Sequence, residues 1–265
     1  MIDSHCHLEQ DGYNKDRQKV IEGLKKELRA VVTCCADPKD WERTKEMVEK
    51  NKGFVFATAG VHPEFIKDIP AEEIKAFFDV IRKEAKEKKI VGIGEVGLDY
   101  YWIKEFIYQD KQKELFIKFI NLSKELDLPL IIHSRDAFLD TVGILEENGM
   151  VKKKVLLHLF GDKNLIERVV KNGWMVSIGP GIQRSKTTRK IARDLPIENL
   201  LIETDSPWFG EEGKRGDPLN TFRAAEKIAE IKGMTVEEVE KQTDKNAISF
   251  YGLKLKTERK AEVKK

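Results

Sequence analysis

The sequence contains no long apolar run and little cysteine. No stretch approaches the roughly 20 consecutive apolar residues that a membrane-spanning helix needs, and the polar start MIDSHCHLEQ is unlike a secretory signal peptide. The three cysteines, Cys6, Cys34 and Cys35, are an odd number without the spacing of a disulfide framework, which favours reduced thiols. We therefore expect a cytoplasmic protein that makes no contact with a membrane.

The chain also lacks a strong excess of either charge. Its formal net charge is +2, but the last twelve residues, KLKTERKAEVKK, alone contribute +4, which leaves −2 for the rest. The net charge of the globular part therefore gives no argument for nucleic-acid binding, and any phosphate-binding surface must be local. We predict a globular domain over residues 1–253 and a basic, disordered tail over residues 254–265.

Short apolar runs rich in β-branched residues alternate with charged segments of helical periodicity. The runs occupy residues 1–6, 30–35, 54–61, 90–97, 128–133, 154–160, 174–179 and 200–205, and helices are expected at 16–29, 41–51, 72–89, 111–127, 219–232 and 235–250. Continuous apolar runs suit strands buried on both faces, as in a parallel sheet. Eight of them predict an α/β fold, a single (β/α)8 barrel of the TIM type, with a doubly wound sheet as the alternative.

Every histidine of the chain lies within or directly after one of these runs. The five are His5, His7, His62, His133 and His158. His5 and His7 are two residues apart, so an extended strand points both rings to one face and Cys6 to the other, where we expect it to pack. Each histidine alone has an ordinary structural explanation, but their shared placement at strand ends favours one common site.

Two carboxylates occupy equivalent positions. Glu95 lies near the end of the fourth run with no lysine or arginine close in sequence, so its burial calls for another cation or a proton. Asp205 ends the eighth run, where an N-cap or an Asx turn before Pro207 is the structural alternative.

Together these side chains predict a metal centre. Four histidines, one glutamate and one aspartate exceed what a single tetrahedral ion with an open position needs, so two divalent ions fit better. Imidazole and carboxylate ligands suit Zn, Mn or Fe, and Mg at an oxygen-rich position. Asp205 is expected either to bind an ion or to accept the proton of an attacking water.

Six ordered motifs, DSHCH, GVHP, GEVGLDYY, HSRDA, LLHLF and ETDSP, resemble those of the TatD-type metal-dependent deoxyribonucleases of the amidohydrolase superfamily. The resemblance extends from residue 3 to residue 253. It implies a TIM-like barrel and metal-dependent phosphodiester hydrolysis of DNA, usually exonucleolytic. Its matching positions imply six metal ligands, which are His5, His7, Glu95, His133, His158 and Asp205. The resemblance also implies that Glu95 takes the bridging position and that Glu95 and Asp205 are the catalytic carboxylates.

The resemblance also points to substrate groups. His62 corresponds to an additional active-site histidine that faces the substrate phosphate. Arg135 can bind a phosphate oxygen, unless it pairs with Asp136 or Asp140, and Lys214 and Arg215 match a basic loop after the eighth strand. The sequence departs from the family pattern at Leu159–Asp162 and at Gly216. Nearby aromatic residues either stack on bases or cap the barrel; they are Tyr100, Tyr101, Trp102, Trp208 and Phe209.

Hydrolysis of DNA or another phosphodiester, from the 3′ end, is the leading prediction, by a chain expected to be monomeric. One alternative is a metal-dependent carbonyl hydrolase, such as an amidase or an aminoacyl-tRNA deacylase, which would use the same ions. Another is a non-catalytic module that binds metal or nucleic acid.

Overall fold

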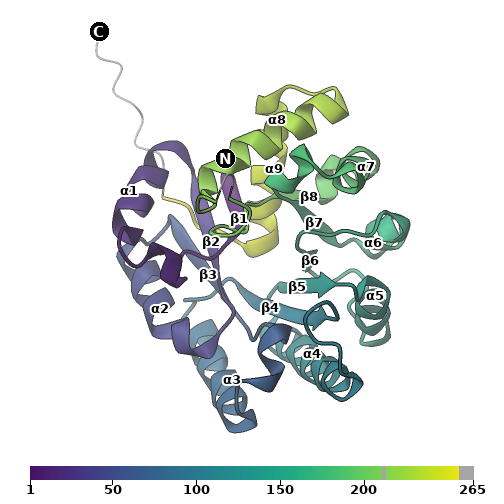
Figure 1. Ribbon diagram of the computed structural model, residues 1–265. Helices are drawn as coiled ribbons and strands as arrows, with labels where there is room; N and C mark the ends of the chain where they lie inside the picture. Colours follow the sequence, from purple (N-terminus) through teal and green to yellow (C-terminus); the bar gives the residue numbers. More distant parts are fainter. Residues whose placement is uncertain (211–212, 257–265) are drawn as a thin grey trace.

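The computed structural model describes residues 1–210 and 213–256, and its eight parallel strands pair side by side in the order β1 to β8 (Figure 1). The strands are β1 (Ile2–Cys6), β2 (Ala30–Cys35), β3 (Val55–Ala59), β4 (Gly92–Asp99), β5 (Leu130–Arg135), β6 (Val155–Leu157), β7 (Met175–Ile178) and β8 (Leu200–Ile202). The helices that connect them are α1 (Arg17–Glu27), α2 (Trp41–Lys50), α3 (Ala71–Lys86), α4 (Phe106–Leu126), α5 (Phe138–Glu147), α6 (Ile166–Asn172) and α7 (Lys186–Asp194). Two more, α8 (Thr221–Lys232) and α9 (Val236–Tyr251), follow the last strand.

The first and last strands meet, which closes the sheet into a barrel. The amide of Asp205 donates to the carbonyl of His5 at 3.0 Å, and the amide of His7 donates to the carbonyl of Ser206 at 2.7 Å. The predicted single (β/α)8 barrel is thus confirmed, and the doubly wound alternative is excluded because such a sheet stays open.

Two strands carry a bulge in their pairing. In β1, Asp3 lies opposite Val31 while Cys6 lies opposite Thr33, so β1 has one extra residue there. The same shift occurs in β4 over the residues that include Glu95. Bulges redirect side chains and are common beside active sites. Here they fall at the two strands that carry His5 and Glu95.

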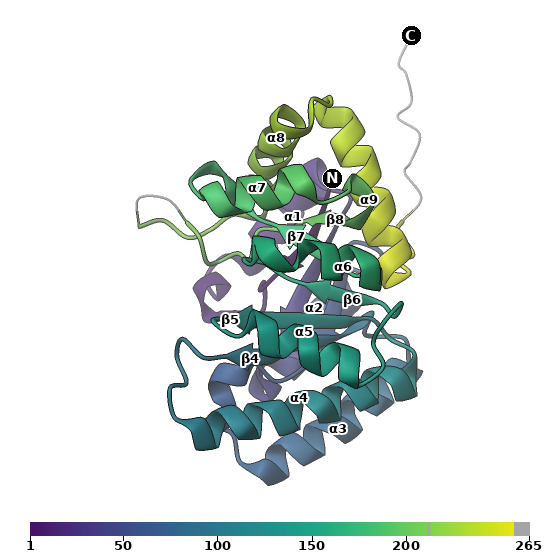
Figure 2. The same cartoon turned by 90° about the vertical axis from the view of Figure 1, so that its right-hand side faces the viewer.

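Helix α9 covers the amino-terminal end of the barrel. Ile2, Ile131 and Leu201, from inside the barrel, form a core with Phe250 and Tyr251 of α9. The Tyr251 hydroxyl donates to the carbonyl of Ser4 at 3.0 Å. Figure 2 shows α9 on one side of the barrel and the loops after β4 and β8 on the other. The carboxyl ends of the strands therefore remain accessible for a site.

Several expectations concern the chain as a whole. All three cysteines are free and buried, and Cys6 packs in the core outside the barrel, as its position between two histidines predicted. Within the described residues, the helices are too short or too polar to cross a membrane. In the predicted tail, the amide of Lys256 donates to the carbonyl of Gly53 at 3.2 Å. The rest of the predicted tail, residues 257–265, lies outside the described part of the chain.

Candidate metal centre

The six predicted ligands converge at the carboxyl end of the barrel. Three lie in strands: His5 in β1, Glu95 in β4 and His133 in β5. His7 and His158 directly follow β1 and β6, and Asp205 is the third residue after β8. Most are almost completely buried: His5 is 1% exposed, Glu95 3% and Asp205 8%. Among residues 1–210 and 213–256, three overlapping groups have the atoms needed to hold a cation. They are His5–Glu95–His158, His5–His7–Asp205 and His62–Glu95–His133.

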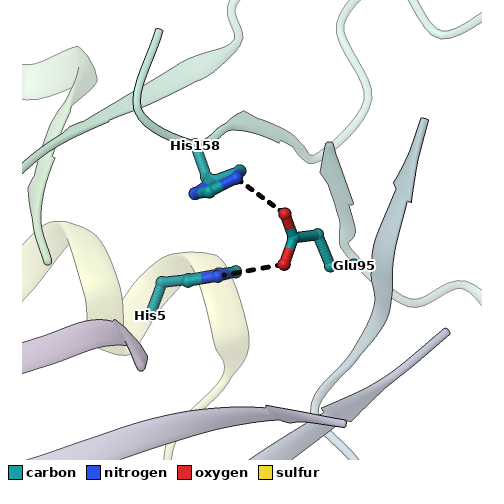
Figure 3. A group of neighbouring side chains, drawn as sticks. All are labelled: His5, Glu95 and His158. Carbon is teal, nitrogen blue, oxygen red and sulfur yellow. Dashed lines mark ion pairs between the residues drawn. The ribbon is translucent and has the colours of Figure 1, made fainter. Parts of the chain in front are cut away.

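Glu95 lies at the centre, and its two oxygens face different imidazoles. Oε2 lies 3.4 Å from Nε2 of His5 and 3.4 Å from Nε2 of His7. Oε1 lies 2.9 Å from Nδ1 of His133 and 2.8 Å from Nε2 of His158. Figure 3 shows the carboxylate between His5 and His158, with one oxygen directed at each ring. A carboxylate whose two oxygens face different pairs of imidazoles is placed so that it could bridge two metal ions.

Asp205 completes the group on the β1 side. Its Oδ1 lies 3.2 Å from Nε2 of His7 and 3.5 Å from Nε2 of His5. These two ring nitrogens are themselves only 3.2 Å apart. Two imidazole nitrogens and a carboxylate oxygen thus face one point in a buried space.

In His7 and His133, the hydrogen bond made by one ring nitrogen leaves the other nitrogen facing this centre with a free lone pair. Nδ1 of His7 lies 2.9 Å from the carbonyl of Cys34, so it must carry the proton, and Nε2 of the neutral ring is free to bind a cation. Nε2 of His133 lies 2.9 Å from Asp99, which leaves its Nδ1 facing Glu95. The donor set and its tautomers therefore fit divalent metal ions.

The electrostatics agree with a cation site. Burial opposes a charge on Glu95, but His158, His62 and His133 outweigh it and hold the pKa of Glu95 well below its usual value. Burial likewise disfavours protonated His7, yet the carboxylates of Asp205 and Glu9 raise the pKa of His7 well above its usual value. Without metal, the carboxylates stabilise protons on the histidine rings. The same carboxylates and ring nitrogens are suited to bind metal ions in place of those protons.

Three further carboxylates lie behind the ligands, and sequence reasoning missed them. Glu9 lies 3.1 Å from Nδ1 of His7, Asp99 lies 2.9 Å from Nε2 of His133, and Glu203 lies 3.6 Å from Nδ1 of His158. Such partners orient a ligating imidazole and raise its basicity. The available signal was their closeness in sequence to His7, Glu95 and Asp205, each within four residues of one of them.

His62 differs from the other four histidines in its hydrogen bonds. The amide of Glu64 donates to its Nδ1 at 3.2 Å, so the neutral ring carries its proton on Nε2. That nitrogen lies 3.5 Å from Oε1 of Glu95. Burial, together with the neighbouring His133, lowers the pKa of His62. His62 therefore presents an N–H donor to the centre.

The predicted basic residues have distinct surroundings. Arg135 is exposed at the end of β5, and its guanidinium lies over the ring of Tyr101, 3.8 Å from the ring centroid. Arg215 donates to both oxygens of Asp16, each at 2.8 Å, and lies over Tyr13. Lys214 is exposed in the same loop after β8.

The two departures from the family pattern have local explanations. Leu159 has a positive φ of 43°, and its amide donates to Glu203 at 2.8 Å, so this turn is fixed through its backbone. A Cβ at Gly216 would lie 2.0 Å from the carbonyl oxygen of Trp208, so the loop after β8 requires glycine there.

The model of the family described as TatD related DNase matches residues 2–252. The chain belongs to this family. It is 34% identical over 262 residues to a human protein named deoxyribonuclease TATDN3, with 95% of this chain and 94% of the human one covered. It is 36% identical over 254 residues to YabD of Bacillus subtilis, named an uncharacterized metal-dependent hydrolase, with 93% and 97% covered. The chain is thus a TatD-family hydrolase.

A solved structure has the same architecture. The TatD homologue YjjV of Escherichia coli superposes with a TM-score of 0.87 at 22% identity, covering 96% of this chain and 98% of that one. This likeness supports the TIM-type barrel independently of the sequence matches.

Proposed function

We propose that the chain hydrolyses phosphodiester bonds of DNA, releasing nucleotides from 3′ ends, with two divalent ions held on either side of Glu95. The observation that carries the proposal is the division of the Glu95 oxygens between His5 and His7 on one side and His133 and His158 on the other. The human relative's name, deoxyribonuclease, supports the choice of DNA. The 3′ direction rests on the family resemblance.

The residues divide into two ligand sets. His5, His7 and Asp205 would hold one ion, His133 and His158 the other, and Glu95 both. Mg, Mn and Zn are the candidate metals for these nitrogen and oxygen ligands. When bound, two such ions neutralise the charge of a phosphate and lower the pKa of an attacking water.

Asp205 is the proposed proton acceptor. Burial raises its pKa, but His5 and His7 outweigh this effect and hold the pKa well below its usual value, so the carboxylate is ionised at neutral pH. An ionised carboxylate at the edge of the ligand set is suited to take a proton from water as the water oxygen bonds to phosphorus. The bond from phosphorus to the leaving sugar oxygen breaks in the same step, and that oxygen takes up a proton. Glu95, in contrast, is fully engaged by its five imidazole neighbours and acts by holding the two ligand sets together.

Phosphate recognition falls to residues beside the centre. His62 donates from Nε2, which suits a phosphate oxygen better than a cation. Arg135, with an exposed guanidinium, and Lys214 add positive charge. Since Asp16 already binds both ends of the Arg215 guanidinium, we assign Arg215 to shaping the loop that carries Lys214.

The test uses chelator-treated protein reloaded separately with Mg, Mn or Zn. Single-stranded DNA oligonucleotides labelled at the 5′ end should shorten one nucleotide at a time, whereas a 3′ label should be released at once. Asp205→Asn should lower the rate by at least about 100-fold, while Asp194→Asn, an exposed aspartate paired with Arg193, should not change it.

Two results would contradict the proposal. Absence of phosphodiester turnover with every metal, combined with hydrolysis of an aminoacyl ester, would favour the carbonyl hydrolase. Full function of Asp205→Asn would favour a non-catalytic binding module.

A further inference from the structure

The pairing between β3 and β4 ends well before β4 does. Its last paired residues are Ala59 and Ile93, whereas β4 continues to Asp99 with its other edge paired to β5. The chain after β3 turns toward β2 instead, where the amide of His62 donates to the carbonyl of Ala36 at 2.9 Å. Within residues 1–210, strand pairing therefore does not join the His62 loop to the end of β4.

The side chain of Gln112, on α4, makes this connection. It is only 1% exposed. Its Oε1 accepts the amide of Asp99 at 3.1 Å, and its Nε2 donates to the carbonyl of Asp99 at 3.3 Å. Nε2 also donates at 2.9 Å to the carbonyl of Pro63, the residue after His62. The carboxamide thus takes the place that a neighbouring strand would occupy, and it ties the end of β4 to the His62 loop.

Both segments that Gln112 joins carry side chains of the candidate centre. Asp99 lies 2.9 Å from Nε2 of His133. On the other segment, Nε2 of His62 lies 3.5 Å from Oε1 of Glu95, and the rings of His62 and His133 have centroids 4.2 Å apart. Any shift of the His62 loop relative to β4 would change the spacing of these two rings. A buried side chain with three hydrogen bonds to the backbone restricts such a shift.

We propose that Gln112 is a positioning residue that fixes His62 relative to His133, and with it the place of a substrate phosphate. This inference rests on the proposed function, in which His62 donates to that phosphate. Gln112 itself does not contact the phosphate; it acts through the backbone that carries His62. Such an effect matters for turnover, since a misplacement of about 1 Å caused by a distant substitution can lower a rate about 100-fold.

The test measures binding of inorganic phosphate to the metal-loaded protein by calorimetry. Gln112→Met keeps a side chain of similar volume but removes all three hydrogen bonds. His62→Asn keeps an acceptor for the amide of Glu64 and removes the Nε2 donor. Each variant should bind phosphate about 10-fold more weakly, because each loses or displaces a hydrogen bond to a charged group.

The double variant decides between positioning and an independent role. If Gln112 acts through His62, Gln112→Met combined with His62→Asn should bind phosphate no more weakly than His62→Asn alone. Losses that multiply in the double variant would overturn the proposal. The number of bound ions at saturating metal should match wild type throughout. Loss of an ion in Gln112→Met would show that Gln112 serves the ligands instead of His62, and would also overturn it.

A milder variant and a matched control complete the test. Gln112→Asn keeps a carboxamide that is one methylene too short to reach both segments, so it should show the same non-additive loss with His62→Asn. Wild-type phosphate affinity in Gln112→Asn would contradict the proposal. Gln109→Met removes another carboxamide of α4, which donates to the carbonyl of Ile103 at 2.9 Å, and it should bind phosphate as wild type does.

These measurements are separable from the test of catalysis. A protein that shows the non-additive phosphate binding but hydrolyses no phosphodiester contradicts the proposed function alone. A protein that hydrolyses DNA while the two substitutions act independently contradicts the positioning role of Gln112 alone.

Discussion

At the scale of single residues, Glu95 is the side chain that joins the two halves of the proposed metal centre. Glu95→Gln replaces one oxygen by an amide nitrogen, which cannot bind a cation. Replacing a residue that only supports a metal ligand lowers metal affinity or activity about 10- to 100-fold. We therefore expect replacement of Glu95 itself to lower activity more than about 100-fold. Metal analysis should show loss of bound ions in parallel. Glu125→Gln, on the surface beside Arg82, is the control and should behave as wild type.

Glu203 tests the carboxylates behind the ligands. In Glu203→Gln the amide oxygen can still accept from Leu159, so the turn is retained, but the negative charge facing His158 is lost. Metal affinity, measured by competition with a chelator, should fall about 10- to 100-fold. The exposed Glu198→Gln is the control. An unchanged metal affinity with lowered thermal stability would show that Glu203 serves only the fold.

Protons and metal ions compete for the same ring nitrogens. The pKa of His7 and that of His158 lie well above the usual value because nearby carboxylates outweigh the effect of burial. These rings are therefore protonated in the metal-free protein at about pH 6.5 and somewhat above it. Metal affinity should rise with pH through this range, and binding should release protons, measured by calorimetry in buffers of different ionisation enthalpy. Affinity that does not depend on pH would contradict this assignment.

The same shifts set the stability of the metal-free protein. Because the folded pKa values of His7 and His158 exceed the unfolded ones, their contribution to folding is complete below the unfolded pKa and is lost as pH rises through the folded pKa. Glu95 has the opposite sign, since its folded pKa is depressed, and its contribution is lost in acid.

The sequence predicts that the histidines, Glu95 and Asp205 lie together, because strand ends of a barrel converge whatever the details of packing. It does not predict Glu9, Asp99 or Glu203 as their partners. A carboxylate close to a strand end has the same local pattern whether it faces solvent or the back of a histidine ring. The alignment of neighbouring strands determines whether the carboxylate faces solvent or a histidine ring. For Asp99 that alignment includes the bulge in β4.

At the scale of elements, β4 and β5 approach each other closely at Gly97. Its φ is 140°, and a Cβ there would lie 2.1 Å from the carbonyl oxygen of His133. Gly97→Ala must therefore push β5 away and displace a predicted ligand. We expect destabilisation of about 1–3 kcal/mol and weaker metal binding, measured by thermal unfolding and metal titration. The control Gly143→Ala, on α5 with open space around it, should be neutral or slightly stabilising.

The predicted bounds of helices and strands agree with the structure where the apolar residues of the element are the buried ones. Helix α4 begins at Phe106 and not at the predicted residue 111. Phe106 and Ile107 are 82% and 66% exposed, so the apolar residues of its first turn do not follow the periodicity of a buried face. The sixth run, predicted over residues 154–160, forms a strand only over Val155–Leu157, because the chain turns at His158 to bring that ring into the centre.

At the scale of the whole molecule, the two ends of the barrel have separate tasks. Helix α9 seals the amino-terminal end, and the candidate metal centre lies at the other. Phe250→Ala should lower stability by about 3–5 kcal/mol because it opens a cavity in the sealed end. The number of ions bound by the folded variant and its turnover should stay at wild-type values. A simultaneous loss of metal would show that the two ends are coupled.

The barrel itself is predictable from sequence because eight buried strands alternating with helices have few other solutions. The particular backbone hydrogen bonds that close it, between β1 and the residues after β8, are not predictable from sequence. Those bonds join His5 to Asp205 and His7 to Ser206. The contacts that close the barrel therefore also bring three predicted ligands together.

The number of ions bound around Glu95 is the most direct measure of this centre. Crystals of the metal-free protein soaked in Mn or Zn, with data collected on both sides of the metal absorption edge, would locate the ions by anomalous scattering. We predict two anomalous peaks for each chain, one beside His5 and His7 and one beside His133 and His158, with Glu95 binding both. A single peak at saturating metal, with one Glu95 oxygen left unbound, would contradict the two-ion centre.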